Sequence, residues 1–414
     1  MRCLLLTQYY PPETGAAQNR LSDWTHRLSS WGHTVTVLTA VPSYPEGRCF
    51  AAYRAQWLYD DTSDGVRVLR TRIFISQSAR FFPRLASYIS FMFASLLVGI
   101  AKAGPQDIVI VESPPLLAGI SGLLLSYWFR ASMVLNVSDL WPESAVALGI
   151  LHNRLLIRLA SWIEEMLYRK SVVVTGQTRH IVSDISRRTG RRTALIPNGV
   201  DFESFTNTAL VYRGKHRAEL GFGDEFVVGY AGLHGLAQGL DVVLDAAKIL
   251  QDDPGIRFVL FGDGPDKSRL QEQAQRRGLM NIRFFPPQPR QAVPTLLACF
   301  DVSVVPLRGL TLFRGALPSK LFECMAAGSP VIVSIAGEAE ALVRCANGGL
   351  CVPPEDGAAL AEAICRLRDD PELGHTLSQN ARTYIARHYD RRDIAAQLHS
   401  LLLPVAERKR QFAE

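Results

Sequence analysis

A turn followed by a cation and a carboxylate is the strongest candidate for chemistry in this chain. Leu317, Pro318 and Ser319 form a turn that opens a predicted helix. Lys320 lies in the first turn of that helix, and Glu323 follows three residues later on the same face. Free N–H groups and the helix dipole attract anions, and a carboxylate can accept bonds from the paired hydroxyls of a ribose. The segment predicts a nucleotide-diphosphate site; an ordinary capped helix with an exposed ion pair is the alternative.

A glycine-rich loop precedes this helix by about eighty residues. Gly232, Gly235 and Gly239 fall within eight residues, between a predicted strand and a predicted helix. His234 and Gln238 lie in the same loop. Loops of this composition can cradle phosphate with their backbone amides, so we expect these residues to contact the diphosphate.

Two shorter loops have similar chemistry. Gly262 and Gly264 close the next predicted strand, where they could line a cleft or form a simple turn. Gly15 and Ala16 follow the first strand and are small enough to let a ligand approach the backbone. Their spacing is not that of a dinucleotide-binding G-x-G-x-x-G motif, and a tight strand–helix turn is the alternative.

Carboxylates follow two strands in the first half of the chain. Asp139 and Glu143 are expected at the edge of a cleft, where they could orient sugar hydroxyls or accept a proton. Trp141, between them, offers a flat apolar surface for a sugar ring or a lipid. Glu112 occupies an equivalent strand end. Capping of a helix by Asp139 is the structural alternative.

The pattern of strands predicts two doubly wound α/β domains. Buried runs of Val, Ile and Leu alternate with helical patterns, which is typical of parallel sheets covered on both faces. At 414 residues the chain is also longer than one core usually supports. Ligands of such sheets lie beyond the carboxyl ends of the strands, so we expect a nucleotide in a cleft between the domains. The strands are expected at residues 2–7, 34–39, 66–70, 107–111, 132–137, 171–175 and 192–196, then 226–231, 256–261, 282–285, 301–306, 330–334 and 349–352.

The boundary between these domains is predicted at the turn-rich segment around Asn198. The first domain is expected at residues 1–197 and the second at 198–385. A final helical segment, 386–414, is expected to pack back on the first domain.

Positive charge is concentrated in the first half of the chain. Residues 1–200 contain 21 Lys and Arg against 13 Asp and Glu, whereas residues 201–414 contain 24 against 26. Nucleic acid and an anionic membrane are the usual partners of such a surface. The arginines are scattered among apolar helices and form no basic tail, which favours a membrane over nucleic acid. A merely solvated basic surface is the alternative.

Two apolar stretches interrupt the soluble pattern. Residues 85–101 and 115–129 are each shorter than the roughly 20 apolar residues that span a bilayer. The first contains Phe91 and Phe93 and is preceded by Arg80 and Arg84, so we expect it to lie on a membrane surface. The second could equally be a buried helix.

The seven cysteines are typical of a protein in a reducing cytoplasm. They include no C-x-x-C pair and no neighbouring histidines, so neither a zinc site nor a disulfide framework is expected.

The order of these motifs resembles that of retaining glycosyltransferases of family 4, which have the GT-B fold. The resemblance is closest to the O-antigen and capsule branch, which transfers N-acetylated amino sugars of the N-acetyl-L-fucosamine type. It covers essentially the whole chain. The matching segments are residues 10–15, 32–40, 138–144, 196–201, 235–240 and 318–323.

The resemblance assigns roles to several residues. Glu323 matches the second Glu of the E-x₇-E motif, which usually holds the ribose, while Gly315 replaces the first. The Arg and Lys that usually grip the diphosphate align with Leu233 and Gln238, so Lys320 and Arg314 are the expected replacements. The predicted catalytic residues are Asp139, Lys320 and Glu323; the predicted donor-binding residues are Gly15, Ala16, Asn198, Gly232, His234, Gly235, Gln238, Gly239, Gly262, Gly264, Arg314, Leu317, Pro318, Ser319, Lys320 and Glu323. Glu112, Trp141 and Glu143 are expected on the acceptor side.

The resemblance implies transfer of a sugar from a UDP-sugar to a polyprenyl-diphosphate-linked saccharide. The resemblance also implies that the configuration of the sugar is retained and that neither a metal nor a cofactor is needed. It further implies a peripheral location on the cytoplasmic face of the inner membrane. A sugar-nucleotide 2-epimerase of similar fold and a nucleotide-binding membrane scaffold without turnover are the alternatives. The apolar, basic first half argues against the epimerase, and Gly315 keeps the scaffold open.

Overall fold

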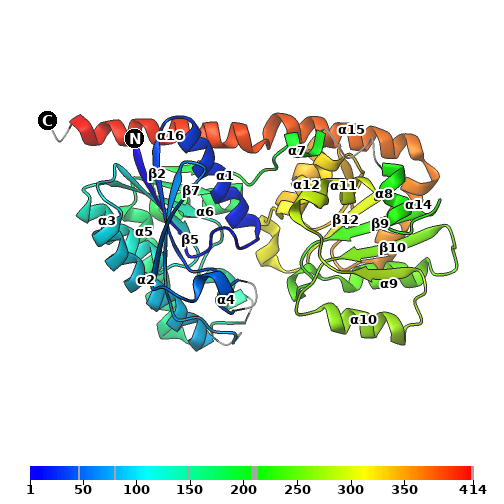
Figure 1. The fold of residues 1–414 in the computed structure, drawn as a ribbon. Helices are drawn as coiled ribbons and strands as arrows, with labels where there is room; N and C mark the ends of the chain where they lie inside the picture. The colour runs from blue at the N-terminus through cyan, green and yellow to red at the C-terminus, as the bar shows by residue number, and fades with distance from the viewer. Residues whose placement is uncertain (45–46, 79–80, 148, 207–212, 412–414) are drawn as a thin grey trace. The chain divides into compact units, whose positions relative to one another are not determined.

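A computed structural model shows that the protein consists of two compact units (Figure 1). The model describes residues 1–44, 47–78, 81–147, 149–206 and 213–411. Unit 1 contains residues 1–197 together with the chain from Arg392 onward, and unit 2 contains residues 198–391. The return to unit 1 therefore lies at residue 392, rather than at the residue 386 expected from the sequence.

Unit 1 is built on an eight-stranded sheet with the order β3-β4-β2-β1-β5-β6-β7-β8. All its neighbouring strands are parallel except β3 and β4. Its strands are β1 (Arg2–Leu6), β2 (Thr34–Ala40), β3 (Leu58–Ser63), β4 (Val66–Thr71), β5 (Ile108–Ser113), β6 (Ser132–Val137), β7 (Val173–Gly176) and β8 (Thr193–Leu195). Its helices are α1 (Ala16–Ser30), η1 (Ala51–Tyr53), α2 (Phe81–Lys102), α3 (Ala118–Trp128), α4 (Glu143–Ala147), α5 (Arg154–Lys170), α6 (Arg179–Thr189) and α16 (Arg391–Gln411).

Both faces of this sheet are buried, which explains the uninterrupted apolar strands. Leu4 and Leu6 of β1 face a core that α2, α3, α5 and α6 complete. Cys3 and Leu5 point the other way, into a core shared with α1 and α16. Successive side chains of a strand alternate between faces, so each strand must be apolar throughout.

Unit 2 is built on a six-stranded parallel sheet with the order β11-β10-β9-β12-β13-β14. The prediction of two doubly wound α/β domains is therefore confirmed. The strands are β9 (Phe226–Ala231), β10 (Ile256–Phe261), β11 (Ile282–Phe285), β12 (Val302–Pro306), β13 (Val331–Ser334) and β14 (Gly349–Cys351). The helices are α7 (Glu203–Thr206), α8 (Arg213–Glu219), η2 (Leu236–Gln238), α9 (Asp241–Ile249), α10 (Lys267–Arg276), η3 (Arg290–Ala292), α11 (Val293–Ala298), η4 (Thr311–Gly315), α12 (Ser319–Ala327), α13 (Glu338–Ala346), α14 (Gly357–Asp369) and α15 (Pro371–His388).

In each sheet the strand order reverses next to the strand that begins the unit. β1 lies between β2 and β5, and β9 lies between β10 and β12. Connections leave the sheet in opposite directions at such a reversal, and the resulting crevice is where ligands of open α/β sheets bind. The loops after β1 and β9 are two of the three glycine-containing loops predicted to contact a ligand, and the third follows β10.

Helix α2 differs from the expectation in length and in orientation. It has 22 residues and is the one helix of the described chain that is long and apolar enough to cross a membrane, by length and composition alone. The inner face of α2 packs on the sheet, where Phe91 is fully buried. The prediction that Phe91 contacts a membrane is therefore wrong, whereas Phe93 is exposed. Arg84 is exposed as well, and Arg80 lies outside the described residues.

Candidate active site

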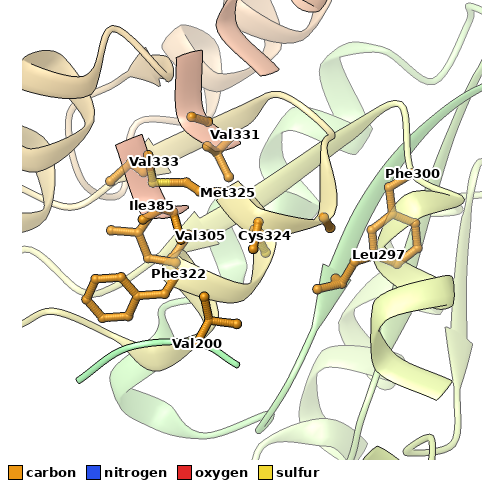
Figure 2. Packing of buried hydrophobic residues seen from close by; sticks show 14 of the residues in the cluster. Val200, Leu297, Phe300, Val305, Phe322, Cys324, Met325, Val331, Val333 and Ile385 are labelled. Atoms are coloured by element: carbon orange, nitrogen blue, oxygen red, sulfur yellow. The ribbon is translucent and has the colours of Figure 1, made fainter. Parts of the chain in front are cut away.

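Helix α12 is fixed by the core of unit 2, and it presents Lys320 in its first turn. Its inner face buries Phe322, Cys324 and Met325 against β12 and β13 (Figure 2). Pro318 is the N-cap residue, and no side chain caps the helix start. The amides of the first turn are thus left without a side-chain cap, as the sequence predicted for an anion-binding helix.

Lys320 is held in a defined position by Tyr230, near the end of β9. Its Nζ donates a hydrogen bond of 2.5 Å to Tyr230 Oη and lies 4.1 Å from the centre of the tyrosine ring. The Tyr230 hydroxyl in turn donates to the Leu233 carbonyl at 2.6 Å. Removal from water lowers the pKa of the Lys320 ammonium to about 8. An anion bound beside it would reverse this effect.

The two glycine loops of unit 2 lie against each other and against Lys320. A Cβ on Gly262 would lie 1.8 Å from the Gly232 carbonyl oxygen, and one on Gly264 would lie 2.3 Å from that of His234. A Cβ on Gly232 would come within 3.1 Å of Lys320 Nζ. All three glycines also have positive φ angles, so larger residues would be strained as well as crowded. The structure therefore brings together the two predicted phosphate loops and the predicted cation.

Buried polar atoms without partners mark the same place. His234 is fully buried, and neither ring nitrogen has a hydrogen-bond partner in the protein. Gln238 Oε1 is also buried without one. Burial, followed by the charges of Lys267 and Lys320, lowers the pKa of His234 to about 4, so its ring is neutral at pH 7. Unpaired buried polar groups are costly, and a polar ligand in the crevice could satisfy them.

Two residues of this cluster are not among the site residues predicted from the sequence. Tyr230 lies in the buried apolar strand β9, and its neighbours in the sequence do not indicate a role at the site. Lys267 begins α10, and its Nζ donates to the carbonyls of Gly262 at 2.7 Å and Phe285 at 3.2 Å. A lysine three residues after Gly264, where a helix begins, is the signal that could have identified Lys267. The charges of Lys267 and Lys320 both act on His234, whereas Leu233 and Gln238, in the loop of His234, are uncharged.

The remaining predicted residues of unit 2 lie in several different elements, and only Gly235 and Gly239 belong to the loop of His234. Gly239 ends η2 with a φ of 59°, and its loop is tied to the segment after β12 by a hydrogen bond from Arg308 N to Ala237 O. Gly235 precedes the same short helix and is buried. Arg314 is exposed in η4, at the position before Gly315. Leu317 is half-buried, Ser319 is the first residue of α12, and Asn198 is buried at the beginning of unit 2.

Glu323 lies one turn after Lys320 and is half-buried. Removal from water raises the pKa of its carboxyl, while the charges of Arg391, Arg290 and Lys320 oppose that shift. When it is ionised, this carboxylate can accept hydrogen bonds from hydroxyl groups. Its contact with a ribose stays a prediction.

In unit 1, Gly15 and Ala16 line a cavity of about 470 Å³. The cavity lies beyond the carboxyl end of β1 and is also lined by Arg84 and Tyr88 of α2. Gln8, on its wall, is buried, and its Oε1 has no hydrogen-bond partner. This cavity joins a cation, a tyrosine and an unpaired amide oxygen, which suits a polar, anionic head group.

Glu112 belongs to the interior of unit 1 and not to an acceptor surface. Its carboxylate accepts hydrogen bonds from Arg20 Nη2 at 2.7 Å and from Asn136 Nδ2 at 2.5 Å, and it contacts Ser138. Both Arg20 and Glu112 are almost completely buried. Because both carboxylate oxygens are already occupied, the acceptor-side prediction for Glu112 is corrected to a structural one.

Asp139, Trp141 and Glu143 lie after β6, as predicted, but in different environments. Asp139 is half-buried, and removal from water raises the pKa of its carboxyl against hydrogen bonds from Ser144 and the Leu140 amide. Trp141 packs partly against the core of unit 1, so only part of its ring is available. Glu143 is exposed at the first position of α4.

Substituting Asp139 with asparagine separates a chemical role from a capping one. We expect Asp139→Asn to lower turnover about 100-fold, the scale of a misplaced acceptor hydroxyl, while donor affinity stays near wild type. Glu143→Gln should have the smaller effect because Glu143 is exposed at the start of α4. The measurement is kcat, donor KM and melting temperature on one preparation. Asparagine can replace both hydrogen bonds of Asp139, so normal turnover with a normal melting temperature would make Asp139 a purely structural residue.

The described part of the chain contains no group of three or more His, Cys, Asp or Glu side chains placed to hold a metal ion.

Comparison with known proteins gives a match for each unit. The family model described as "Glycosyl transferase 4-like domain" matches residues 15–199, and the one described as "Glycosyl transferases group 1" matches residues 213–384. The first range covers unit 1 from residue 15 to Pro197 and extends two residues into unit 2, and the second range lies within unit 2.

Two bacterial relatives match over much of the chain. WcaI of Escherichia coli (strain K12), a glycosyl transferase whose name links it to colanic acid biosynthesis, is 28% identical over 96% of this chain and 98% of its own. WbjE of Pseudomonas aeruginosa, also named a glycosyltransferase, is 27% identical over 72% of this chain and 76% of its own.

Solved structures with the same fold include enzymes and nucleotide complexes. Sucrose-phosphate synthase from Thermosynechococcus elongatus aligns with a TM-score of 0.76 at 20% identity, over 97% of this chain and 98% of its own. HepE of Anabaena, solved with UDP and with UDP-glucose, aligns with a TM-score of 0.73 at 20% identity, over 97% of this chain and 99% of its own.

Proposed function

We propose that this chain, whose two units match glycosyltransferase family models and which has the GT-B fold, transfers a sugar from a UDP-sugar to a lipid-diphosphate-linked saccharide. The observation that carries the donor assignment is the cluster of Lys320, the two glycine loops and the unpaired His234 in unit 2. The complexes of HepE with UDP and UDP-glucose support a uridine nucleotide at this site.

The proposed reaction retains the configuration of the transferred sugar. The acceptor hydroxyl attacks the anomeric carbon on the face that the diphosphate leaves. The bond between that carbon and the diphosphate oxygen breaks, and its electron pair stays with UDP. The hydroxyl proton passes to the departing phosphate oxygen, so the step consumes no other reactant. The protein's part is to stabilise the charge that develops on the diphosphate, through Lys320, the loop amides and the start of α12. No metal is needed for this scheme, since these groups supply the positive charge.

The acceptor is proposed to bind in unit 1, with its anionic diphosphate near Arg84 in the cavity beside Gly15 and Ala16. The similarity to WcaI, whose name refers to colanic acid biosynthesis, supports a place in the synthesis of a bacterial polysaccharide. We propose the cytoplasmic face of the inner membrane as the place where the protein acts. The motifs shared with the N-acetyl-L-fucosamine branch suggest an N-acetylated amino sugar as the donor.

Release of free UDP tests the proposal. Purified protein is incubated with a UDP-N-acetylhexosamine or with UDP-glucose, with and without an undecaprenyl-diphosphate-linked saccharide in detergent. We expect UDP release only when donor and acceptor are both present. Release of UDP without acceptor, or formation of a new sugar nucleotide, would indicate the epimerase instead. Binding of the donors without turnover, whichever donor and acceptor are supplied, would indicate the non-catalytic scaffold.

A further inference from the structure

Helix α2 turns an apolar stripe away from the core of unit 1. Phe82, Ile89, Phe93, Leu97 and Ile100 recur at intervals of seven, four, four and three residues, which places them on one side of the helix. All five are exposed, Phe93 at 57% and Leu97 at 68%. These five residues do not lie on the side of the helix that faces the core. A surface helix normally carries polar residues on its outer side, so this stripe requires an explanation.

Helices α3 and α5 continue the pattern beside α2 (Figure 1). Leu124, Tyr127 and Trp128 are exposed on α3, with Trp128 at 62%. Leu155, Leu159 and Trp162 are exposed on α5 at helical spacing, with Trp162 at 64%. The outward stripes of α2, α3 and α5 are together called the three-helix face.

Close packing through two glycines brings these helices side by side. A Cβ on Gly99 of α2 would lie 2.6 Å from the Leu125 side chain of α3. A Cβ on Gly119 of α3 would lie 2.3 Å from the Leu167 side chain of α5. Glycine at both contacts lets the helix axes approach, so the three stripes form neighbouring parts of one surface.

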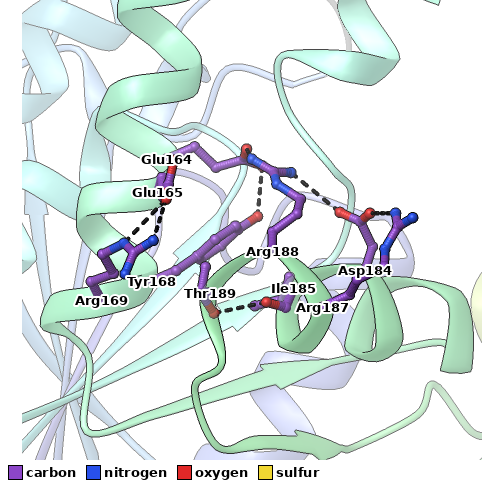
Figure 3. Close-up of polar contacts among 9 residues, drawn as sticks. All are labelled: Glu164, Glu165, Tyr168, Arg169, Asp184, Ile185, Arg187, Arg188 and Thr189. Atoms are coloured by element: carbon purple, nitrogen blue, oxygen red, sulfur yellow. Dashed lines mark hydrogen bonds and ion pairs between the residues drawn. The ribbon is translucent and has the colours of Figure 1, made fainter.

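The opposite side of α5 is fixed inside the protein. Glu164 accepts hydrogen bonds from Tyr168 Oη and from Arg188 Nη2 of α6, both at 2.6 Å (Figure 3). Ala160 and Leu167 are buried on that side as well. Helix α5 therefore cannot turn Trp162 inward without breaking a buried ion pair. Its outward apolar residues are a stable feature of the folded unit.

Exposed cations lie on or next to the same three helices, and on α5 they border the apolar stripe. Arg84 and Lys102 lie on α2, Arg130 follows α3, and Arg154 and Arg158 lie on α5; all are exposed. The sequences of α2 and α3 contain no Asp or Glu. On α5 the two carboxylates are Glu164, which is buried, and Glu165, which pairs with Arg169 at 2.5 Å. The face is thus apolar, aromatic and cationic at once.

We propose that the three-helix face docks on the surface of an anionic phospholipid bilayer. The three helices lie in the plane of the interface, with Tyr127, Trp128 and Trp162 at the level of the headgroups and the cations on lipid phosphates. Helix α2 does not cross the bilayer, because one of its sides is part of the core of unit 1. A second copy of this chain is a poor occupant, since a two-fold contact would place this basic surface against itself.

Docking would also place the cavity of unit 1 at the membrane. Pro83, Arg84, Ser87 and Tyr88, at the start of α2, line that cavity. An acceptor whose lipid tail stays in the bilayer could then reach the cavity with its head group. This consequence rests on the proposed function, whereas the docking itself does not.

Co-sedimentation with vesicles tests the docking in the absence of any substrate. The vesicles consist of phosphatidylcholine, alone or with about one-third phosphatidylglycerol. We expect the wild-type protein to bind the anionic vesicles, and Phe93→Ser combined with Leu97→Ser to lower the partition coefficient about tenfold or more. The pairs Trp128→Ser with Trp162→Ser, and Arg154→Glu with Arg158→Glu, should have effects of similar size. High salt should weaken the binding in part, because the apolar contribution is not screened.

Matched variants elsewhere in the chain serve as controls. Met280 is 87% exposed in unit 2, so Met280→Ser should bind like wild type. Arg283→Glu, on β11, is the matched charge reversal. Melting temperatures check that each variant is folded.

The docking proposal would be overturned if the three-helix variants bound vesicles as well as the wild type does. It would also be overturned if the wild-type protein did not sediment with anionic vesicles. A dimer in solution that the three-helix variants dissociate would also overturn it and assign the face to self-association. The UDP-release assay in detergent does not depend on docking, so failure of the proposed function is detected separately.

Discussion

Replacing Lys320 with alanine is expected to lower kcat/KM for the donor about 10- to 150-fold, because hydrogen bonds to charged groups contribute about 1.5–3 kcal/mol each. Lys320→Met keeps the length of the side chain and removes only the charge, so it should lose as much activity as Lys320→Ala. Tyr230→Phe removes the hydroxyl that holds the ammonium and should have a smaller effect. The measurement is steady-state release of UDP, with UDP binding followed by calorimetry.

The stability of these variants is expected to move in the opposite direction. The pKa of Lys320 lies below its ordinary value, so the folded state disfavours the charged ammonium. Lys320→Met should therefore melt at or above the wild-type temperature. The contribution of Lys320 to stability should rise between about pH 8 and pH 10.5, where the unfolded chain still holds the proton that the folded one has lost. Wild-type kinetics in a folded Lys320→Met would show that the diphosphate is not bound there.

The same pKa predicts the pH dependence of donor binding. Below about pH 8 Lys320 is protonated in the free enzyme, and donor affinity should fall as the pH rises through that value. A bound diphosphate raises the pKa of a neighbouring ammonium, so binding above pH 8 should take up protons. Calorimetry of UDP binding in buffers with different ionisation enthalpies measures this uptake, which Lys320→Met should abolish.

The second large effect concerns stability. Glu112→Gln is expected to destabilise unit 1 by about 3 kcal/mol or more, because it leaves the Arg20 guanidinium in the interior without its counter-charge. Arg20 also stacks 5.3 Å from the Trp24 ring, so tryptophan fluorescence during urea unfolding reports on this region. A double variant, Arg20→Met with Glu112→Leu, should recover much of the loss, since replacing both members of a buried ion pair by apolar residues is often close to neutral.

The turnover of Glu112→Gln tests whether Glu112 also has a role on the acceptor side. Normal stability of Glu112→Gln together with a large loss of turnover would return the residue to the acceptor side, contrary to its position in the structure. A loss of stability with near-normal turnover of the folded fraction is the expected result.

The strands were predictable because burial on both faces leaves a continuous apolar run. Thirteen expected strands correspond to strands of the two sheets. The exception is β3, Leu58–Ser63, which is a polar, largely exposed edge strand paired antiparallel with β4. Its contacts, such as the ion pair of Asp60 with Arg67, form across the hairpin and leave no apolar pattern in the sequence. Helices α7 and α8, which follow the turn-rich boundary segment, have no counterpart among the elements expected from the sequence.

The candidate site was predictable where local chemistry defines it. Glycine loops and a helix start depend on neighbouring residues, so Gly232, Gly264 and Lys320 were found. Tyr230 was missed because its role depends on a contact with a residue ninety positions away. Phe91 was misplaced for a related reason: a helix that is apolar on several sides does not show in its sequence which side the sheet will cover.

The return of the chain to unit 1 has a consequence for synthesis. Ile394, Leu398 and Leu402 of α16 are buried in the same core as Leu21 and Val35. Unit 2 is one continuous segment, whereas the core of unit 1 includes residues translated after all of unit 2. On the ribosome, unit 2 can therefore finish folding first, and the sheet of unit 1 waits with one face incompletely covered. Nascent chains halted before residue 392 should expose that face to chaperones, even though every strand of both sheets has already been made.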